Sequence, residues 1–399
     1  MRADTVRRVV LAPDKFKGTV TAQRLVDLMA TAITESGSGA AVTPLPVADG
    51  GDGSVTAALS AGWSAVSVPA SDAWGTPLDV PLARDGDRAI VEVAAVCGLG
   101  ALRPGPAEAA SGTTYGVGQA IGALLDDGVR DITLALGGSA STDGGTGMLA
   151  ALGVRLNDRA GKAPAPGGTA LTSVTQVAID ELHPALREVR LTLACDVDTP
   201  MLGRDGSAEM FARQKGADDA TVARLSDGLA HVAPLLERAF SADGAARRAG
   251  AGAAGGLGWA GMLLGGVPRS GAEVFLDLLG AEEVIRGADL VITGEGRLDE
   301  QSLRGKAPVA VARLAASHGV RTVAVVGSDQ LTDKAPGAGR KGRGRTGAGP
   351  FADVVALDRM DPACVDDPEL TGRLVGLAVH TLLAAHPAPS ATPRKGALS

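Results

Sequence analysis

Short apolar runs that end in polar, glycine-rich segments recur along this chain. The first run, RRVVLAP at residues 7–13, predicts a strand, and apolar side chains at helical spacing over residues 21–33 predict a helix that begins after the cap residue Thr21. A second apolar run, AVTPLPVA at residues 41–48, predicts another strand. This alternation favours a parallel sheet, whose ligand crevice lies at the carboxyl ends of the strands.

The pattern changes after residue 67. Residues 78–93 form two alternating runs around an Asp-Gly pair, which predicts a β-hairpin. A helix is expected at 113–125, a strand at 131–138, a helix near 147–152 and a strand at 190–197. Apolar strands that end in glycine turns return at 289–302 and 320–328. We therefore expect an α/β protein with a parallel-sheet domain from 1–67 and 288–386, a second α/β domain inserted at 68–287, and a disordered tail at 387–399.

Two further segments have unusual composition. Residues 251–268 carry no charge and imitate a membrane span, but their glycine content predicts a buried turn that leads into a short helix. Residues 334–350 form a basic, glycine-rich run, for which a flexible surface loop is expected and a phosphate or nucleic-acid contact is the alternative.

Composition narrows the function classes. The chain has 399 residues, 56 of them glycine, and only 2% aromatic residues, which is typical of a core of small aliphatic side chains with many close backbone approaches. The net charge of −7 is spread over interspersed acids and bases, which disfavours nucleic-acid binding. The three cysteines lie far apart in the sequence, which indicates neither a disulfide framework nor a zinc site. The N-terminus lacks the pattern of a secretory signal, and both observations favour a cytoplasmic protein.

Common catalytic motifs are missing. GAGAAGG at residues 250–256 matches a dinucleotide-binding pattern only formally, because no strand precedes it, and a Walker A motif is absent. The five histidines are scattered outside the glycine turns, so a Ser-His-Asp hydrolase is weakly supported.

Six predicted strand ends instead share one pattern, in which an apolar run is followed by glycine with an acid, a hydroxyl or a lysine. They are residues 14–18, 49–53, 137–145, 196–198, 294–299 and 327–329. Each alone reads as a turn with a helix cap. If the acids gather at one edge they need cations, which suggests Mg²⁺, and glycine amides suggest phosphate. Phosphoryl transfer uses carboxylates that bind a metal and amides that bind phosphate, together with cations that hold the phosphates. The cations nearest the glycine turns are Lys17, Lys215, Arg297 and Lys306.

An ordered set of motifs carries a resemblance to a known family. VVLAPDKFKGTVTA, PVADGGDGS, LGGSASTDGGTGML, LACDVDTPMLG, RQKGA, AGAAGGLG and LVITGEGRLDEQSLRGKAP together resemble the bacterial glycerate kinases that form 2-phosphoglycerate, from Val9 to Val326. The resemblance implies ATP- and Mg²⁺-dependent phosphorylation of D-glycerate. It also implies a flavodoxin-like, Rossmann-like domain from the two chain ends and a second domain inserted between them.

This resemblance and the strand-end pattern assign candidate roles. Catalytic candidates are Lys17, Asp49, Asp143 and Asp196, and metal candidates are Asp196 and Glu295. Substrate or phosphate candidates are Asp14, Gly50, Gly137, Gly138, Ser139, Lys215, Gly294, Gly296, Arg297 and Lys306. Asp52 stands where the family commonly has Glu and is expected to cap the next helix, and Thr199 stands where Asn is common. The expected ligands are D-glycerate, ATP and Mg²⁺, without nucleic acid or membrane, and a homodimer is left open.

Two other functions stay open. The same acids could serve a metal-dependent phosphatase or hydrolase, which would leave ATP intact while cleaving a phosphoester. A non-catalytic, ligand-responsive regulator on the same fold is the other alternative. Loss of the acids would mark such a regulator, whereas this chain retains them.

Overall fold

The computed structural model describes residues 7–100, 103–331 and 350–384. The chain divides into two compact units, unit 1 from Met1–Val47 with Leu276–Ser399, and unit 2 from Ala48–Phe275. The basic run at 334–350, except for Pro350, and the tail at 387–399 lie outside the described residues.

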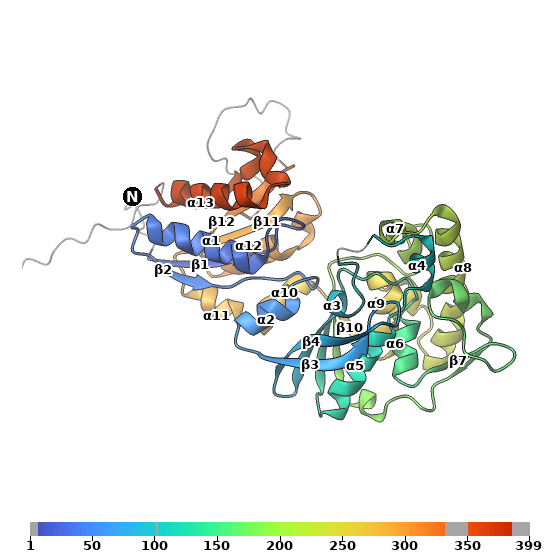
Figure 1. The fold of residues 1–399 in the computed structure, drawn as a ribbon. Coiled ribbons are helices and arrows are strands. Elements are labelled where there is room, and N and C mark those ends of the chain that lie inside the picture. Colours follow the sequence, from blue (N-terminus) through green and yellow to red (C-terminus); the bar gives the residue numbers. More distant parts are fainter. Residues whose placement is uncertain (1–6, 101–102, 332–349, 385–399) are drawn as a thin grey trace, which may run out of the picture. The chain divides into compact units, whose positions relative to one another are not determined.

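Unit 1 is built on a five-stranded sheet with helices on both faces (Figure 1). Its strands are β1 (Arg8–Pro13), β2 (Ala41–Pro44), β11 (Leu290–Leu298), β12 (Arg321–Asp329) and β13 (Asp353–Ala356). Its α-helices are α1 (Ala22–Glu35), α11 (Ala281–Arg286), α12 (Ala307–Ser317) and α13 (Pro368–Ala384). Short 3₁₀ helices are η5 (Ser302–Arg304), η6 (Leu357–Arg359) and η7 (Pro362–Val365).

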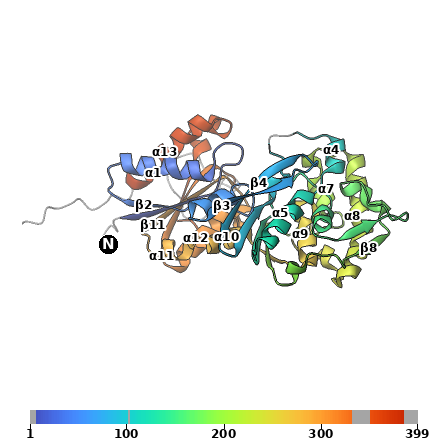
Figure 2. The same cartoon turned by 60° about the horizontal axis from the view of Figure 1, so that its bottom comes forward.

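The sheet of unit 1 has the strand order typical of flavodoxin-like folds. The order is β13-β12-β11-β1-β2 and every pairing is parallel. Numbered along the unit, the strand order is 2-1-3-4-5. Strand β2 is added on one side of β1 and the later strands are added on the other, so the strand order reverses between β1 and β11. Helices α1 and α13 cover one face of the sheet, and α11 and α12 cover the other (Figure 2). The predicted parallel sheet, built from both ends of the chain, is confirmed.

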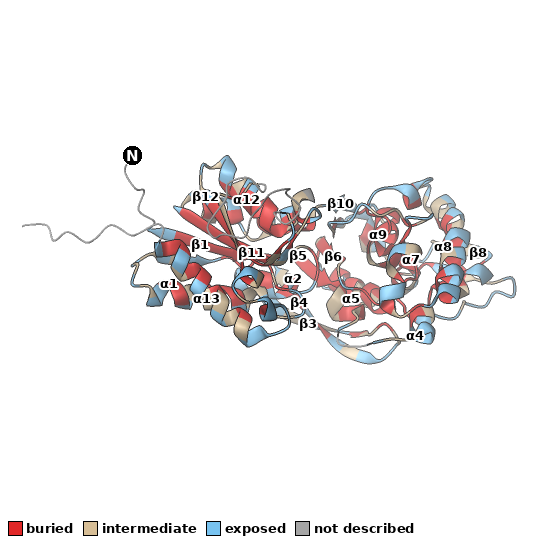
Figure 3. Cartoon of the chain, turned by 90° about the horizontal axis from the view of Figure 1, so that it is seen from above, coloured by how far each residue is buried: buried red, intermediate tan, exposed pale blue. Residues whose placement is uncertain are grey.

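Local sequence explains these elements. Thr21 caps α1 by accepting a hydrogen bond from Arg24 N at 3.2 Å. The apolar side of α1 packs with α13 and with Val9 and Leu11 of β1. A second apolar cluster lies between α12 and the other face of the sheet and includes Val326. Figure 3 shows the strands as the buried layer between these helices.

Unit 2 contains a six-stranded sheet and a small two-stranded sheet. Its strands are β3 (Ser64–Ser71), β4 (Pro77–Asp85), β5 (Arg88–Glu92), β6 (Asp131–Ala135), β7 (Arg155–Asn157), β8 (Gln176–Ala178), β9 (Arg190–Ala194) and β10 (Val267–Arg269). Its helices are α2 (Ser54–Ser60), α3 (Val93–Cys97), α4 (Pro106–Ser111), α5 (Tyr115–Asp126), α6 (Thr146–Ala151), α7 (Ser207–Phe211), α8 (Asp219–Phe240) and α9 (Ala253–Leu263). Helix α10 (Gly271–Leu278) crosses from unit 2 into unit 1.

The large sheet of unit 2 follows the chain from strand to strand. Its order is β10-β9-β6-β5-β4-β3, antiparallel over β3, β4 and β5 and parallel from β5 to β10. The predicted hairpin at the Asp-Gly pair is β4 and β5, and the helices expected near 113–125 and 147–152 are α5 and α6. A large apolar core includes Ile90, Ile132, Leu134 and Trp259.

The glycine-rich segment at 251–268 is a buried turn followed by a short helix, as expected. Ala254, Gly255 and Gly256 have positive φ, and regular helix continues to Leu263. Gly255 needs its hydrogen side chain, because a Cβ there would lie 2.1 Å from Ser141 O. Within the described residues, no helix combines the length and the apolar character that crossing a membrane would need.

The units join at other positions than the expected bounds of 67 and 288. Helix α2 packs against β4 and β5, and β3 pairs with β4, so residues from Ala48 onward belong to unit 2. At the second join the chain returns to unit 1 within α10. The assignment of the units to independent domains stays a prediction.

Candidate active site

In unit 1 the first polar strand end lies at the point where the strand order reverses. Pro13 pairs with Gly294, and Asp14 N donates to Gly294 O at 2.8 Å, so the ends of β1 and β11 lie side by side. Asp14 is buried, and its Oδ1 accepts a hydrogen bond from Lys15 N at 2.7 Å. Ligands of sheets with this order bind at such a switch point.

The turn after Asp14 packs directly on β11. Phe16 N donates to Val20 O at 2.8 Å, which closes the turn. A Cβ at Gly296 would lie 3.3 Å from Phe16 Cα, so glycine at 296 lets the turn lie close to the strand. Lys17 is exposed on this turn, and its ammonium makes no hydrogen bond or ion pair with the other residues that the structure describes.

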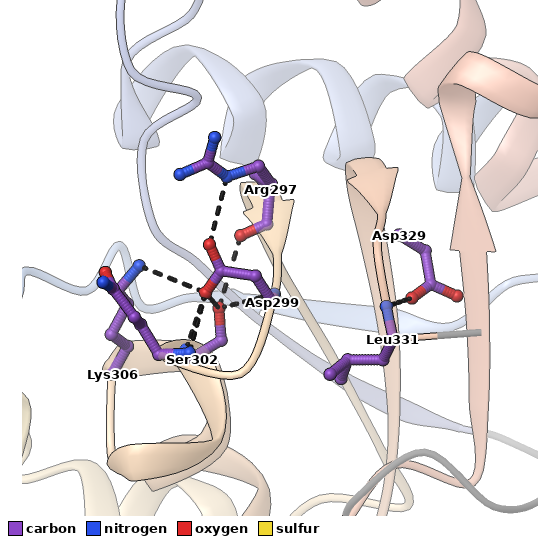
Figure 4. A network of polar contacts seen from close by, with 7 residues as sticks. Arg297, Asp299, Ser302, Lys306, Asp329 and Leu331 are labelled. Carbon is purple, nitrogen blue, oxygen red and sulfur yellow. Dashed lines mark hydrogen bonds and ion pairs between the residues drawn. The ribbon is translucent and has the colours of Figure 1, made fainter. Parts of the chain in front are cut away.

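A network around Asp299 follows the end of β11 (Figure 4). Its Oδ1 accepts hydrogen bonds from Gln301 N at 2.9 Å and Ser302 N at 3.1 Å. Arg297 Nε lies 3.1 Å from Oδ2, and Lys306 Nζ lies 4.0 Å from Oδ1. Burial acts to raise the pKa of Asp299, but these amides and cations outweigh it and hold the pKa below its usual value. Asp299 is therefore a charged anchor for two cations.

The glycines of β11 and β12 do not form the expected turns. Gly294, Glu295, Gly296 and Arg297 continue β11, and Ser328 and Asp329 continue β12, with Arg297 paired to Ser328. These glycines allow close packing, since a Cβ at Gly294 would lie 2.2 Å from Val325 O. The expected phosphate cradle at 294–296 is thus strand, not loop. Asp329 is buried, and its Oδ1 accepts from Leu331 N at 3.0 Å.

In unit 2 a second set of strand ends lies together. Gly137 N donates to Gly50 O at 2.9 Å, and Gly50 has a φ of +81°. A Cβ at Gly50 would lie 2.8 Å from Ala194 O, and one at Gly271 would lie 2.1 Å from Asp49 O. Glycine at these positions lets the backbones after β2, β6 and β9 and before α10 meet. The Gly137 amide is used by this contact, so it is not available to the phosphate expected there.

Asp196 follows β9 and lies beside the start of α10, and its pKa is shifted from the ordinary value. Its Oδ1 accepts hydrogen bonds from Ser270 Oγ at 3.1 Å and Gly271 N at 2.8 Å. The residue keeps exposed surface, but loss of water around the carboxylate, followed by the charge of Asp49, raises the pKa of Asp196 to about 6. Asp49 Oδ1 accepts from Gly51 N at 3.1 Å. The two candidate acids are therefore close enough to influence each other.

Lys215 is a buried cation beneath the 137–145 loop. Its Nζ donates to Ser139 Oγ at 2.9 Å and to Ser141 O at 2.6 Å, and only 3% of the residue is exposed. Burial lowers the pKa of Lys215 to about 8, although Cys97 and Asp143 act to raise it. An ammonium has three N–H donors, and two of them are engaged by this loop. Ser139 itself is buried, and Gly138 has a φ of +77°.

Asp143 is enclosed in the interior of unit 2. It is 0% exposed, and its Oδ2 accepts hydrogen bonds from Thr114 N at 2.8 Å, Thr114 Oγ1 at 2.9 Å, Gly147 N at 3.1 Å and Thr113 Oγ1 at 3.2 Å. Its Oδ1 accepts from Gly145 N at 3.0 Å. Such a carboxylate links the starts of α5 and α6, so this geometry favours a structural role over the catalytic one expected for Asp143.

Several contacts differ from the sequence expectation. The N-cap residue of α2 is Gly53 and not Asp52, and Glu92 accepts hydrogen bonds at the start of the helix, from Gly53 N at 3.2 Å and Val55 N at 3.0 Å. Thr199 contributes its carbonyl, which accepts from Gly252 N at 2.8 Å. Ser270 and Gly271 were not among the expected site residues. Their signal was present, since a hydroxyl and a glycine follow the short run of β10.

The metal candidates are divided between the units, with Asp196 in unit 2, beside the catalytic candidate Asp49, and Glu295 in unit 1. Among the described residues, no group of three or more His, Cys, Asp or Glu side chains could hold a metal ion. Mg²⁺ commonly takes one or two carboxylates and completes its shell with water and substrate phosphates. The neighbouring Asp49 and Asp196 therefore fit such an ion when phosphates supply the other oxygens.

Comparison with known proteins identifies the family. The sequence model described as "Glycerate kinase family" matches residues 9–341. The chain belongs to the glycerate kinase family. This confirms the resemblance found in the strand-end motifs, and the catalytic class, a kinase, is confirmed with it.

Relatives and a solved structure agree with the family. Glycerate kinase of Bacillus subtilis (strain 168) is 36% identical over 325 residues, which span 80% of this chain and 85% of that protein. Glycerate 2-kinase of Escherichia coli (strain K12) is 36% identical over 336 residues, or 82% of this chain and 86% of that one. The crystal structure of a candidate glycerate kinase 2 from Salmonella typhimurium LT2 matches with a TM-score of 0.77 and 31% identity, covering 95% of this chain and 99% of that chain.

In this member of the glycerate kinase family, the six strand ends fall into two sets. Residues 14–18, 294–299 and 327–329 lie along the carboxyl edge of the sheet in unit 1. Residues 49–53, 137–145 and 196–198 lie together in unit 2, joined through Gly50, Gly137 and Gly271. The roles of the individual residues remain proposals.

Proposed function

We propose that this kinase transfers the γ-phosphoryl group of ATP to the C2 hydroxyl of D-glycerate and forms 2-phosphoglycerate. The family match and the names of the relatives support glycerate as the acceptor, and the name glycerate 2-kinase of the Escherichia coli relative supports the 2-phosphate. The observation that carries the mechanism is the Asp196 carboxylate, held by Ser270 and Gly271 beside Asp49.

Asp196 is suited to accept the proton of the acceptor hydroxyl. Ser270 Oγ and Gly271 N donate to Oδ1, the Ala272 amide also acts on the carboxylate, and the acceptor hydroxyl would donate to Oδ2. A pKa of about 6 keeps the carboxylate ionised at neutral pH and makes it a better proton acceptor than an ordinary Asp. In the transfer, the hydroxyl proton passes to Asp196 while the hydroxyl oxygen bonds to the γ-phosphorus. The bond from that phosphorus to the bridging oxygen breaks, and ADP leaves with the electron pair.

The remaining groups would hold charge. When bound, Mg²⁺ would supply positive charge to the phosphate oxygens. Asp49 would hold this ion in unit 2, and Lys215 would direct its third N–H to an anionic group of the substrate. In unit 1, Lys17 and Arg297 would hold a carboxylate or a phosphate, and arginine does so with two parallel hydrogen bonds.

A coupled ADP-release assay tests this function. Purified protein with ATP and Mg²⁺ is expected to release ADP with D-glycerate, and far less with L-glycerate, glycolate or no acceptor. The Asp196→Asn variant should lose about 100-fold or more in kcat. Asp198→Asn is the matched control, because Asp198 is an exposed acid two residues away, and it should stay near wild type.

Two results would redirect the function. Cleavage of a phosphoester while labelled ATP stays intact would indicate a phosphatase or hydrolase. Ligand binding without turnover on any hydroxy acid would indicate the regulator. If ADP release proceeds and Asp196→Asn matches Asp198→Asn, the reaction stands but Asp196 is not its proton acceptor.

A further inference from the structure

The network after β11 contains a fixed carboxylate that holds two cations. Gln301 N and Ser302 N both donate to Asp299 Oδ1, and Asp299 N donates to Ser302 Oγ at 3.1 Å. These contacts come from the short turn that contains Asp299, so the carboxylate is fixed without help from the cations. The side chain of Asp299 is only 14% exposed.

One nitrogen of the Arg297 guanidinium donates to this carboxylate, and the two terminal nitrogens do not. The contact to Oδ2 is made by Nε, and Figure 4 shows both terminal nitrogens directed away from Asp299. The side chain of Arg297 is 60% exposed, so these nitrogens can reach a ligand. A guanidinium held in this way is preorganised for two parallel hydrogen bonds to an oxyanion.

A second cation lies on the carboxylate of Asp299, and a third lies on the neighbouring turn. Lys306 lies on the other oxygen of the same carboxylate, with 31% of its side chain exposed. The turn that carries Lys17 packs on Gly296, the residue before Arg297. Arg297 and Lys306 thus share one carboxylate, and the third cation, Lys17, has no partner among the described residues. Lys17 follows β1 and Arg297 is near the end of β11, where the strand order reverses, whereas Lys306 is the N-cap residue of α12.

We propose that this switch point of unit 1 binds the polyphosphate of the nucleotide, with Asp299 as the positioning residue that orients Arg297 and Lys306 for it. A single carboxylate, as in glycerate, is matched by one arginine fork, whereas several adjacent cations match the multiple charges of a polyphosphate. Sheets with this strand order bind phosphate-bearing ligands at this point. The inference rests on the proposed function only for the identity of its ligand, a nucleoside triphosphate.

Direct binding measurements test the proposal without turnover. Calorimetric titration with ADP and with a non-hydrolysable ATP analogue gives the Kd of each variant. Arg297→Ala should weaken Kd about 10- to 100-fold, as expected for lost charge-assisted hydrogen bonds. Arg286→Ala is the matched control, because Arg286 is an exposed arginine of unit 1 paired with Glu282, and its Kd should be unchanged.

A double-mutant cycle separates positioning from general structural support. Asp299→Asn should weaken Kd about 3- to 10-fold in the wild type, and should add almost nothing in the Arg297→Ala background. A purely structural role would give the same loss in both backgrounds. Should Asp299→Asn fail to fold, Arg297→Gln at the exposed position still tests the site. In steady state, KM for ATP should rise while KM for D-glycerate stays unchanged.

The opposite split would overturn the inference. If Arg297→Ala and Arg297→Gln bind ADP as tightly as wild type and raise only KM for D-glycerate, the cations serve the acceptor. Failure of the proposed function is a distinct result, because wild-type protein would then bind the nucleotide in the titration and yet release no ADP with D-glycerate.

Discussion

The buried cation Lys215 should destabilise unit 2 in a pH-dependent way. The folded pKa of Lys215 is about 8, against an ordinary value of 10.5. Because the folded state holds this proton more weakly than the unfolded chain, stability is highest above pH 10.5 and is lost as pH falls through 8. The difference corresponds to about 3 kcal/mol at pH 7. About 2 kcal/mol of this should return by pH 9.5.

Lys215→Met removes this dependence, since methionine fills similar space without a charge. The substitution also removes the hydrogen bonds to Ser139 and Ser141, but that loss is the same at either pH. The wild-type free energy of unfolding, minus that of Lys215→Met, should therefore rise by about 2 kcal/mol between pH 7 and pH 9.5.

Urea unfolding followed by tryptophan fluorescence measures this difference. All three tryptophans, Trp63, Trp74 and Trp259, lie in unit 2, so the signal reports the unit that contains Lys215. Lys162→Met is the matched control, because Lys162 is an exposed lysine of the same unit, and its difference from wild type should not change with pH. An equal difference between wild type and Lys215→Met at both pH values would refute the lowered pKa of Lys215.

Four further predictions concern unit 2. Gly50→Ala should lower the free energy of unfolding by at least about 1 kcal/mol more than Gly53→Ala does. Both glycines have positive φ, but only at Gly50 would the added Cβ meet Ala194 O. Equal losses for the two variants in urea titrations would contradict this. With Asp196 as proton acceptor, kcat/KM should rise with pH through about 6, and a flat profile would exclude it. Asp196→Asn should also raise the free energy of unfolding by ~1 kcal/mol at pH 8, with allowance for the exposure of Asp196, because it removes a carboxylate that is costly to ionise in the folded state. Below pH 4 the carboxylate is protonated in the folded state, so the gain should vanish. Thermal unfolding at both pH values checks this. Asp143→Asn should lower the free energy of unfolding by about 3 kcal/mol, whereas Asp158→Asn, at a half-buried turn position, should lower it far less. Similar melting temperatures for the two variants would contradict the structural role of Asp143.

Local patterns predicted the elements of both units well. Periodic apolar residues and the Thr21 cap predicted β1 and α1, and the Asp-Gly pair predicted the β4–β5 hairpin. These features depend on neighbours in the sequence, which is why they can be recognised without the fold. The order of strands in unit 1 could not be deduced from such patterns, because β11 pairs with β1 across the whole of unit 2.

The glycines at the strand ends were predicted to let backbone segments come close together and to form turns. The close approach is confirmed, but some of these glycines lie within strands. Gly50 and Gly271 do bring separate backbones together, whereas Gly294 and Gly327 serve close contacts within β11 and β12. A strand and a turn can both require a missing Cβ, so the residue type alone does not distinguish them.

The partners of the candidate acids were beyond sequence reasoning. Asp143 bonds Thr114 at a separation of 29 residues, and Asp196 bonds Ser270 at a separation of 74. Sequence patterns therefore found the acids but could not tell that Asp143 is enclosed by donors while Asp196 keeps exposed surface. That distinction depends on burial, which only the folded chain reveals.

Phosphorus NMR of the reaction products tests the central claim most directly. With wild-type protein, ATP, Mg²⁺ and D-glycerate, the γ-phosphate signal of ATP should disappear. A doublet should replace it, because a phosphate on C2 couples to the single proton of that carbon. A triplet would instead show a phosphate on C3, next to two protons, and would contradict the 2-phosphate product. A singlet of inorganic phosphate alone would contradict transfer to glycerate altogether.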